Sequence, residues 1–99
     1  MITIKFLPQA VEELDESILY YEKLYKGLGL DFHREVKKTI KLISFNPEIW
    51  QQYEDGTRRI STSRFPFKIV YLLKGSTLWV VAIAHHRKFP EYWSARIKN

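Results

Sequence analysis

Two consecutive helical stretches joined by a glycine-containing break constrain the fold of this chain more than any other feature. Apolar residues recur at steps of three and four from Pro8 to Lys26, and again from about Leu28 to Phe45. This is the period of an amphipathic helix. Gly27 and Gly29 interrupt the pattern, and Asn46-Pro47 ends the second stretch. Because the connection is so short, the two helices must fold back as an antiparallel hairpin.

The apolar stripe of each helix is predicted to face the core. In the first helix the stripe consists of Val11, Leu14, Ile18, Tyr21 and Tyr25. In the second it consists of Phe32, Val36, Ile40 and Ile43, with Leu30 near the start. Acidic residues lie early and lysines late in both helices, which complements the helix dipole.

Strand patterns flank the helical hairpin on both sides. Ile2 to Leu7 alternates with period two. Three further strands are predicted at 57–63, 67–73 and 78–86, the last two joined by a hairpin turn. A short helix is expected between Pro90 and Lys98. The predicted class is α+β, with an N-terminal strand, an antiparallel helical hairpin, a three-stranded antiparallel meander in a mainly antiparallel sheet, and a short C-terminal helix. Residues 1–99 are expected to form one domain.

The last two strands are apolar on both faces. Residues 69–73 and 78–84 lack the polar alternation of a sheet with one solvated side. We therefore expect the second face of the sheet to be covered. Either a partner chain completes it, or the chain covers itself with its C-terminal helix and the segment around Trp50.

Charge is distributed unevenly along the chain. Residues 1–55 carry 7 basic and 10 acidic side chains, whereas residues 56–99 carry 9 basic side chains and one acid. The basic half favours an anionic partner, either nucleic acid or an acidic protein segment. The chain has no cysteine, and His85-His86 lacks metal-ligand spacing, so no metal site and no cofactor are expected. The absence of a long apolar run or signal-peptide layout suggests a cytoplasmic protein without membrane contact.

Several segments together resemble one known family. They are LGLDF at 28–32, the Asn46-Pro47 stop, Arg58-Arg59 on a strand, RFPFKIVY at 64–71 and AIAHHRKFPEYW at 82–93. The chain resembles the RelE/ParE superfamily of type II toxin–antitoxin toxins, in the plasmid stabilisation branch. The resemblance implies a bacterial or archaeal growth-inhibiting toxin that is neutralised by a cognate antitoxin.

The resemblance leaves the mode of action open. ParE-like members poison DNA gyrase by binding it, whereas RelE-like members cleave mRNA on the ribosome; a degenerate toxin that only binds its antitoxin is a third alternative. The free protein as a homodimer and a toxin–antitoxin hetero-oligomer are both compatible with the resemblance. We favour the ParE-like, non-enzymatic interpretation.

The preference for a non-enzymatic toxin rests on the nuclease pattern of the superfamily. Resemblance places Arg59, Lys68 and Arg87 at three of its catalytic positions. Ser61 stands where a second basic residue is expected, and Trp93 where a tyrosine is expected. If the chain is a nuclease, its acid or base would have to come from His85, His86 or Tyr92.

A second group of residues is predicted to contact the antitoxin or the target. Its members are Arg58, Arg64, Lys88, Tyr92, Trp93 and Arg96. The aromatic residues near the C-terminus are also typical of a packed core. Lys37, Lys38 and Lys41 are interpreted as the solvated face of the second helix.

Overall fold

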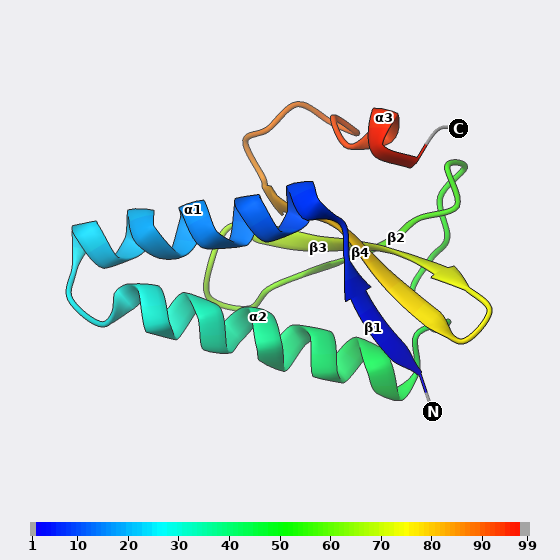
Figure 1. The fold of residues 1–99 in the computed structure, drawn as a ribbon, viewed down its shortest axis with the longest axis horizontal. Helices are drawn as coiled ribbons and strands as arrows, with labels where there is room; N and C mark the ends of the chain where they lie inside the picture. The colour runs from blue at the N-terminus through cyan, green and yellow to red at the C-terminus, as the bar shows by residue number, and fades with distance from the viewer. Residues whose placement is uncertain (1, 98–99) are drawn as a thin grey trace.

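The computed structural model describes residues 2–97 and confirms the predicted order of elements (Figure 1). Strand β1 (Thr3–Phe6) leads into helices α1 (Pro8–Leu24) and α2 (Leu28–Phe45). Strands β2 (Arg58–Ser61), β3 (Phe67–Lys74) and β4 (Thr77–His85) follow, and the short helix α3 (Ser94–Ile97) comes last. The fold is α+β, as predicted, and the predicted helix residue Lys98 lies outside the described residues.

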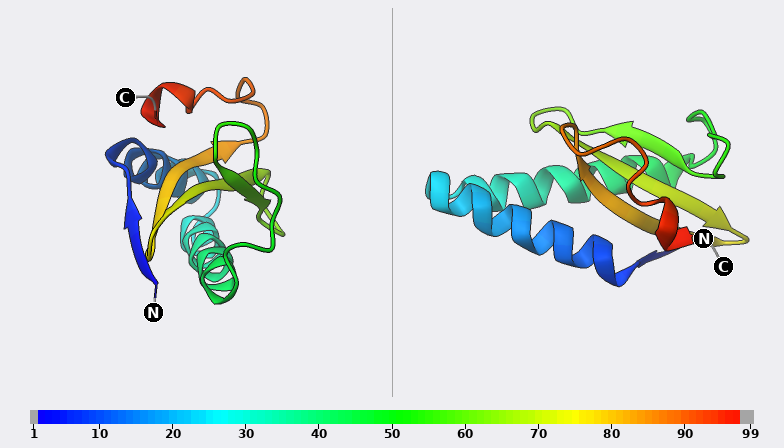
Figure 2. Two further views of the ribbon diagram at one scale, coloured as in Figure 1. Left: turned by 90° about the vertical axis from the view of Figure 1, so that its right-hand side faces the viewer. Right: turned by 90° about the horizontal axis from the view of Figure 1, so that it is seen from above.

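The four strands form one mixed sheet in the order β1-β4-β3-β2. β2 pairs antiparallel with β3, with Ser61 opposite Lys68, and β3 pairs antiparallel with β4, with Ile69 opposite Ile83. β1 is parallel to β4, with Thr3 opposite Thr77. Parallel strands need a long crossover, which the helical hairpin supplies. The hairpin covers one face of the sheet, and the C-terminal segment crosses the other (Figure 2).

The main core lies between the helical hairpin and the sheet. Phe32, Val36 and Ile43 of α2 are fully buried, and the ring of Tyr21 packs against those of Phe32 and Phe65. The Tyr21–Phe65 contact is edge-to-face, and aromatic contacts of this kind add to the burial of apolar area. These residues confirm the predicted stripes near the middle of each helix.

Three residues of the predicted stripes were placed wrongly. Val11, Tyr25 and Leu30 are 41%, 74% and 50% exposed. The inward face of α1 begins at Ala10, which is fully buried, so Val11 turns toward solvent. Tyr25 follows the last residue of α1 and has extended backbone, so the helical period no longer applies to it.

Gly29 allows the two helices to approach closely. A Cβ at this position would lie 2.5 Å from the backbone oxygen of Ile18. The carboxylate of Glu22 accepts hydrogen bonds from the backbone N–H groups of Gly27 at 2.9 Å and Gly29 at 3.0 Å. The break between the helices is therefore a packed and hydrogen-bonded turn as well as an interruption of the helical pattern.

Residues of the chain itself cover most of the second face of the sheet. Trp93 is 1% exposed and packs with Val70, Val81, Ala82 and Ala84. This supports the expectation that the chain covers this face itself with its C-terminal segment, whereas the expected contribution of Trp50 was wrong, because Trp50 packs against the main core. A groove of about 290 Å³ stays open at its margin, and it is lined by residues that include Leu7, Leu72, Trp79 and Ile97.

Within the described residues, no helix is both long and apolar enough to cross a membrane. The same part of the chain contains no cluster of three or more His, Cys, Asp or Glu side chains that could hold a metal ion.

Candidate functional site

A polar pocket forms where β2 meets β3 and the end of β4. It has a volume of about 250 Å³ and is lined by Tyr53, Arg59, Ile60, Ser61, Lys68 and His86. Arg59 and Ser61 are alternate residues of β2 and therefore share one face of the strand. Ser61 pairs with Lys68 across the ladder. The structure thus brings Arg59, Ser61, Lys68 and His86 together, whereas Arg87 is exposed and does not line the pocket.

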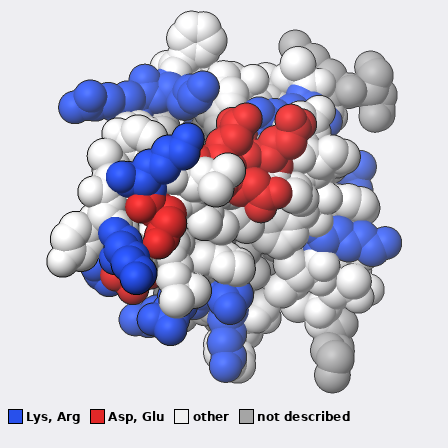
Figure 3. Space-filling view, turned by 60° about the vertical axis from the view of Figure 1, so that its left-hand side comes forward, with Lys and Arg blue, Asp and Glu red and all other residues white. Residues whose placement is uncertain are grey.

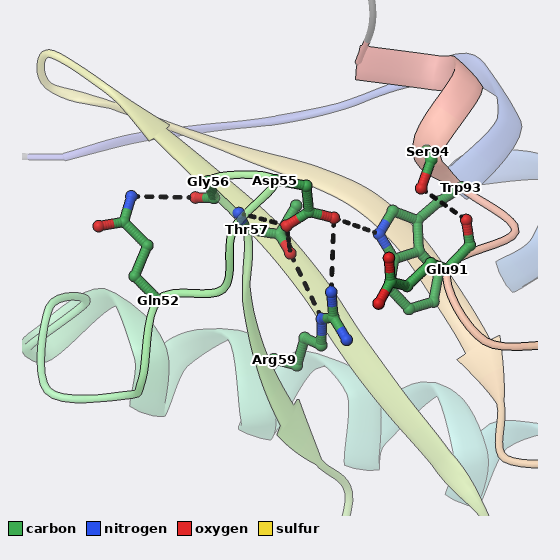
Figure 4. A network of polar contacts seen from close by, with 8 residues as sticks. All are labelled: Gln52, Asp55, Gly56, Thr57, Arg59, Glu91, Trp93 and Ser94. Carbon is green, nitrogen blue, oxygen red and sulfur yellow. Dashed lines mark hydrogen bonds and ion pairs between the residues drawn. The ribbon is translucent and has the colours of Figure 1, made fainter.

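The guanidinium of Arg59 is engaged inside the molecule. Its Nη2 lies 3.4 Å from Oδ2 of Asp55, and its Nε donates to Oγ1 of Thr57 at 3.3 Å (Figure 4). Its Cζ lies 3.7 Å from the ring centroid of Tyr53 and 4.7 Å from that of Trp93. The side chain is only 12% exposed. Its charge is therefore already balanced by a carboxylate and two aromatic faces.

Asp55 organises this arrangement. One carboxylate oxygen accepts from the backbone N–H and the hydroxyl of Thr57, and the other accepts from Nε1 of Trp93 at 3.2 Å. Burial by itself raises the pKa of Asp55, but hydrogen bonds from Thr57 and Trp93 and the charge of Arg59 outweigh it, so the net pKa is lowered. Asp55 and Thr57 thereby form a side-chain turn just before β2. An Asp two residues before Thr57 is the signal for such a side-chain turn.

Lys68 and His86 are the remaining basic side chains of the pocket. Nζ of Lys68 lies 5.5 Å from the ring centroid of Trp93. Among the described residues, no carboxylate forms a salt bridge with Lys68. His86 is exposed at the pocket rim. These two side chains are therefore available to a ligand, in contrast to Arg59.

His85 faces a different hollow from its neighbour. Its ring packs against Phe67 at 5.0 Å between centroids, and its Nδ1 accepts a hydrogen bond from the backbone N–H of Arg87. It lines a hollow against α1 that also includes Glu16 and Lys88. Burial lowers the pKa of His85, and the charges of Arg87, His86 and Lys88 lower it further. His85 is therefore held mainly neutral, outside the polar pocket.

The C-terminal segment is fastened to α1 by Glu13. The carboxylate of Glu13 accepts a hydrogen bond from the Tyr92 hydroxyl. It also accepts one from each terminal nitrogen of Arg96, both at 2.9 Å. It also accepts one from the backbone N–H of Ile83 at 3.1 Å. Burial and the carboxylate of Glu13 raise the pKa of Tyr92 well above its usual range. Sequence reasoning assigned Glu13 only to the helix dipole.

The residues predicted for partner contacts divide into two groups. Tyr92, Trp93 and Arg96 hold the C-terminal segment in place, and Nε of Arg58 donates to the carbonyl of Trp50 at 3.0 Å. Arg64 and Lys88 remain on the surface. Arg64 makes an exposed ion pair with Asp31 at 3.8 Å, and its Cζ lies 5.3 Å from the ring centroid of Phe65.

Charges of both signs lie side by side on the face that carries the end of the helical hairpin. Figure 3 shows small groups of acidic side chains with lysine and arginine side chains beside them. The separation of charge along the sequence therefore does not produce a patch of one sign on that face. Coulombic attraction of a partner to that face would be weak at physiological salt.

The sequence together with the helical hairpin and the mixed sheet places the chain in the RelE/ParE toxin superfamily. The chain belongs to the family of ParE toxins of type II toxin–antitoxin systems, parDE, whose sequence model matches residues 4–89. A solved structure described as the chromosomal ParDE TA system from P. aeruginosa has the same fold. It has a TM-score of 0.74 and 21% identity, covering 86% of this chain and 96% of that chain. A search of curated proteins finds no match.

Proposed function

We propose that this type II toxin arrests growth by binding and poisoning DNA gyrase, and that a cognate antitoxin neutralises it. The observation that carries the proposal is the engagement of Arg59. It is the only basic residue that β2 contributes to the polar pocket, and its guanidinium is paired with Asp55 and stacked on Tyr53 and Trp93. Because the guanidinium of Arg59 is already paired and stacked, it stabilises the fold and is poorly placed to neutralise the charge of a phosphate in RNA cleavage.

The side chains near the pocket at the positions of a catalytic acid or base also favour a toxin that acts by binding. RNA cleavage by the 2′-hydroxyl requires a base, an acid and cations for the phosphorane charge. The Tyr92 hydroxyl donates a hydrogen bond to Glu13, and burial raises the pKa of Tyr92, so it keeps its proton. Trp93 is buried and has no transferable proton at neutral pH. A protein that acts by contact needs none of these groups to be free.

A supercoiling assay with purified gyrase tests the proposal directly. The toxin is expected to reduce supercoiling and to trap a cleaved gyrase–DNA complex in a dose-dependent manner. Adding equimolar antitoxin should restore activity, which is the internal control. Unaltered supercoiling without trapped complex at saturating toxin would refute the gyrase assignment.

A second candidate, a ribosome-dependent mRNA endonuclease, is supported by Lys68 and His86. They are a cation and an imidazole, and both line one pocket. Mapping of mRNA 5′ ends after induced expression separates the two candidates. New mRNA ends in phase with codons would favour the nuclease. If no such ends form and the supercoiling assay shows gyrase inhibition, the first proposal is favoured.

The antitoxin is proposed to be the product of the neighbouring reading frame. Co-expression of the two genes should abolish growth arrest and give a complex on size-exclusion chromatography. The same measurement on the free toxin distinguishes a monomer from a homodimer. Normal growth when the toxin is expressed alone would indicate a degenerate toxin instead.

A further inference from the structure

The hollow that contains His85 lies between α1 and the end of β4. Its volume is about 410 Å³, which is within the range of sites that hold small organic molecules. The α1 residues that line it are three or four positions apart and so share one face of the helix; they are Glu13, Glu16, Ser17 and Tyr20. The sheet and the segment after it contribute Phe67, Ile83, His85 and Lys88. This α1–β4 hollow shares no lining residue with the polar pocket.

Aromatic rings contribute to the walls of the hollow from both α1 and the sheet. Tyr20 is 61% exposed, and its ring packs edge-to-face with that of Tyr21 at 5.3 Å between centroids. Phe67 of β3 packs edge-to-face with His85 at 5.0 Å. Proteins commonly hold nucleobases by stacking them on rings of this kind. The walls therefore favour a planar aromatic ligand.

His85 supplies a hydrogen-bond donor to the hollow. Its Nδ1 accepts the backbone N–H of Arg87 at 3.0 Å, so Nδ1 carries no proton. Burial and the neighbouring charges lower the pKa of His85, so the ring is mainly neutral. A neutral imidazole has a single N–H, which must then be on Nε2. A ligand in the hollow therefore meets an N–H donor at His85.

Two exposed charges of opposite sign complete the hollow. Glu16 and Lys88 are exposed, and neither forms a salt bridge among the described residues. Glu13, by contrast, is held by Tyr92 and Arg96. Glu16 can therefore accept hydrogen bonds from a ligand, and Lys88 can neutralise a ligand anion.

We propose that the α1–β4 hollow binds a purine nucleoside monophosphate, with guanine as the preferred base. The base stacks on Tyr20, and the phosphate lies beside Lys88. The adjacent N1–H and N2–H groups of guanine donate to the carboxylate of Glu16, and O6 accepts from Nε2 of His85. Adenine fits less well, because its pairing edge presents a donor beside an acceptor, so the carboxylate gains one hydrogen bond instead of two. The site is separate from the proposed action on gyrase and does not depend on it.

Isothermal titration calorimetry of the whole chain with GMP tests the site, and related ligands assign its parts. GMP should bind saturably. Guanosine lacks the phosphate and inosine monophosphate lacks the N2 amino group, so each should bind at least about fivefold more weakly. Ribose 5-phosphate has no base and should show no saturable binding. If it binds as tightly as GMP, the hollow is an anion site only and the proposal is overturned.

Two substitutions test whether the nucleotide occupies this hollow. Glu16→Gln removes the anionic acceptor and should raise the dissociation constant for GMP at least about tenfold, the loss expected for hydrogen bonds to a charged group. Glu12→Gln, an exposed acid of α1 outside the hollow, is its matched control and should stay within about twofold. Lys88→Met should weaken GMP about threefold and leave guanosine unchanged, with Lys23→Met as the control. All four positions are exposed, so thermal unfolding should show intact folds.

Three further outcomes would overturn the proposal. The first is the absence of saturable GMP binding to the wild-type chain up to millimolar concentration. The second is GMP binding that Glu16→Gln and Lys88→Met leave unchanged, because the nucleotide would then lie elsewhere. The third is tighter binding of AMP than of GMP, which contradicts the pairing of the base with Glu16. The gyrase proposal stands or falls separately, by the supercoiling assay.

Discussion

Glu13 on α1 and Arg96 on α3 form a two-pronged ion pair with both nitrogen–oxygen distances at 2.9 Å. The side chains are 17% and 15% exposed. The same carboxylate holds the Tyr92 hydroxyl and the backbone of Ile83. A single acid near the start of the chain therefore fixes the segment that covers the second face of the sheet.

Replacing Arg96 by Met should lower the free energy of unfolding by about 2–4 kcal/mol, because it leaves a largely buried carboxylate without its charged partner. Urea denaturation measures the loss. Arg34→Met is the matched control, since Arg34 makes a 3.8 Å ion pair whose side chains are 67% and 38% exposed. Its effect should stay within about 0.5 kcal/mol. Equal losses in the two variants would contradict this account of the C-terminal segment.

Glu35 should make the stability depend on acid pH. Hydrogen bonds from the side chain and backbone of Ser63 lower the pKa of Glu35 in the folded state. The stabilisation is therefore present above the unfolded pKa of about 4.3 and is lost as pH falls through the lower folded value.

Denaturation of wild type and Glu35→Gln between pH 7 and pH 2.5 measures this contribution. The substitution should be destabilising at pH 7, and the gap between the two proteins should narrow below about pH 4. A gap that stays constant over this range would show that ionisation of Glu35 does not contribute.

Gly29→Ala should destabilise the protein by about 1–3 kcal/mol, the range expected when a methyl group is forced into a packed contact. The new Cβ would lie 2.5 Å from the backbone oxygen of Ile18, which cannot move without shifting α1. Leu30→Ala, at a half-exposed position next to it, is the control and should cost less. The midpoint of thermal unfolding distinguishes the two. Equal midpoints for Gly29→Ala and Leu30→Ala would mean that the close approach of the two helices at Gly29 does not contribute to stability.

The double variant Lys68→Met, His86→Ala should still arrest growth if the toxin acts by contact with gyrase. These are the two basic pocket residues that make no ion pair among the described residues. Colony counts after induction, with immunoblotting to confirm equal expression, measure the effect, and viability should match the wild-type toxin within about threefold. Loss of toxicity at equal protein level would favour the nuclease candidate.

Helix periodicity and helix-stop residues predicted the architecture well. The pattern at 28–45 and the Asn46-Pro47 stop matched the bounds of α2, and the two-sided apolar pattern of β3 and β4 correctly required cover on both faces. The exposure of Tyr25 could not be predicted, because the chain leaves the helix at that residue. Local period carries no information beyond the end of an element.

The candidate site was predicted in part. The resemblance grouped Arg59, Ser61 and Lys68, and strand alternation puts Arg59 and Ser61 on one face, but the pairing of Ser61 with Lys68 is known only from the structure. The engagement of Arg59 by Asp55 and Trp93 did not follow, since Trp93 is 38 positions from Asp55 in sequence. Contacts over such separations depend on how the C-terminal segment crosses the sheet, which no local pattern specifies.

The parallel pairing of Thr3 with Thr77 also determines when the fold can form. During synthesis α1 and α2 can pair as soon as they emerge, but β1 has no partner until β4 leaves the ribosome. Domains whose contacts join distant positions fold more slowly than local helical ones. Until then the apolar face of the hairpin lacks its sheet, so the nascent chain is exposed to aggregation. Folding is therefore completed only after translation has passed β4, and the toxin surface becomes competent at that late stage.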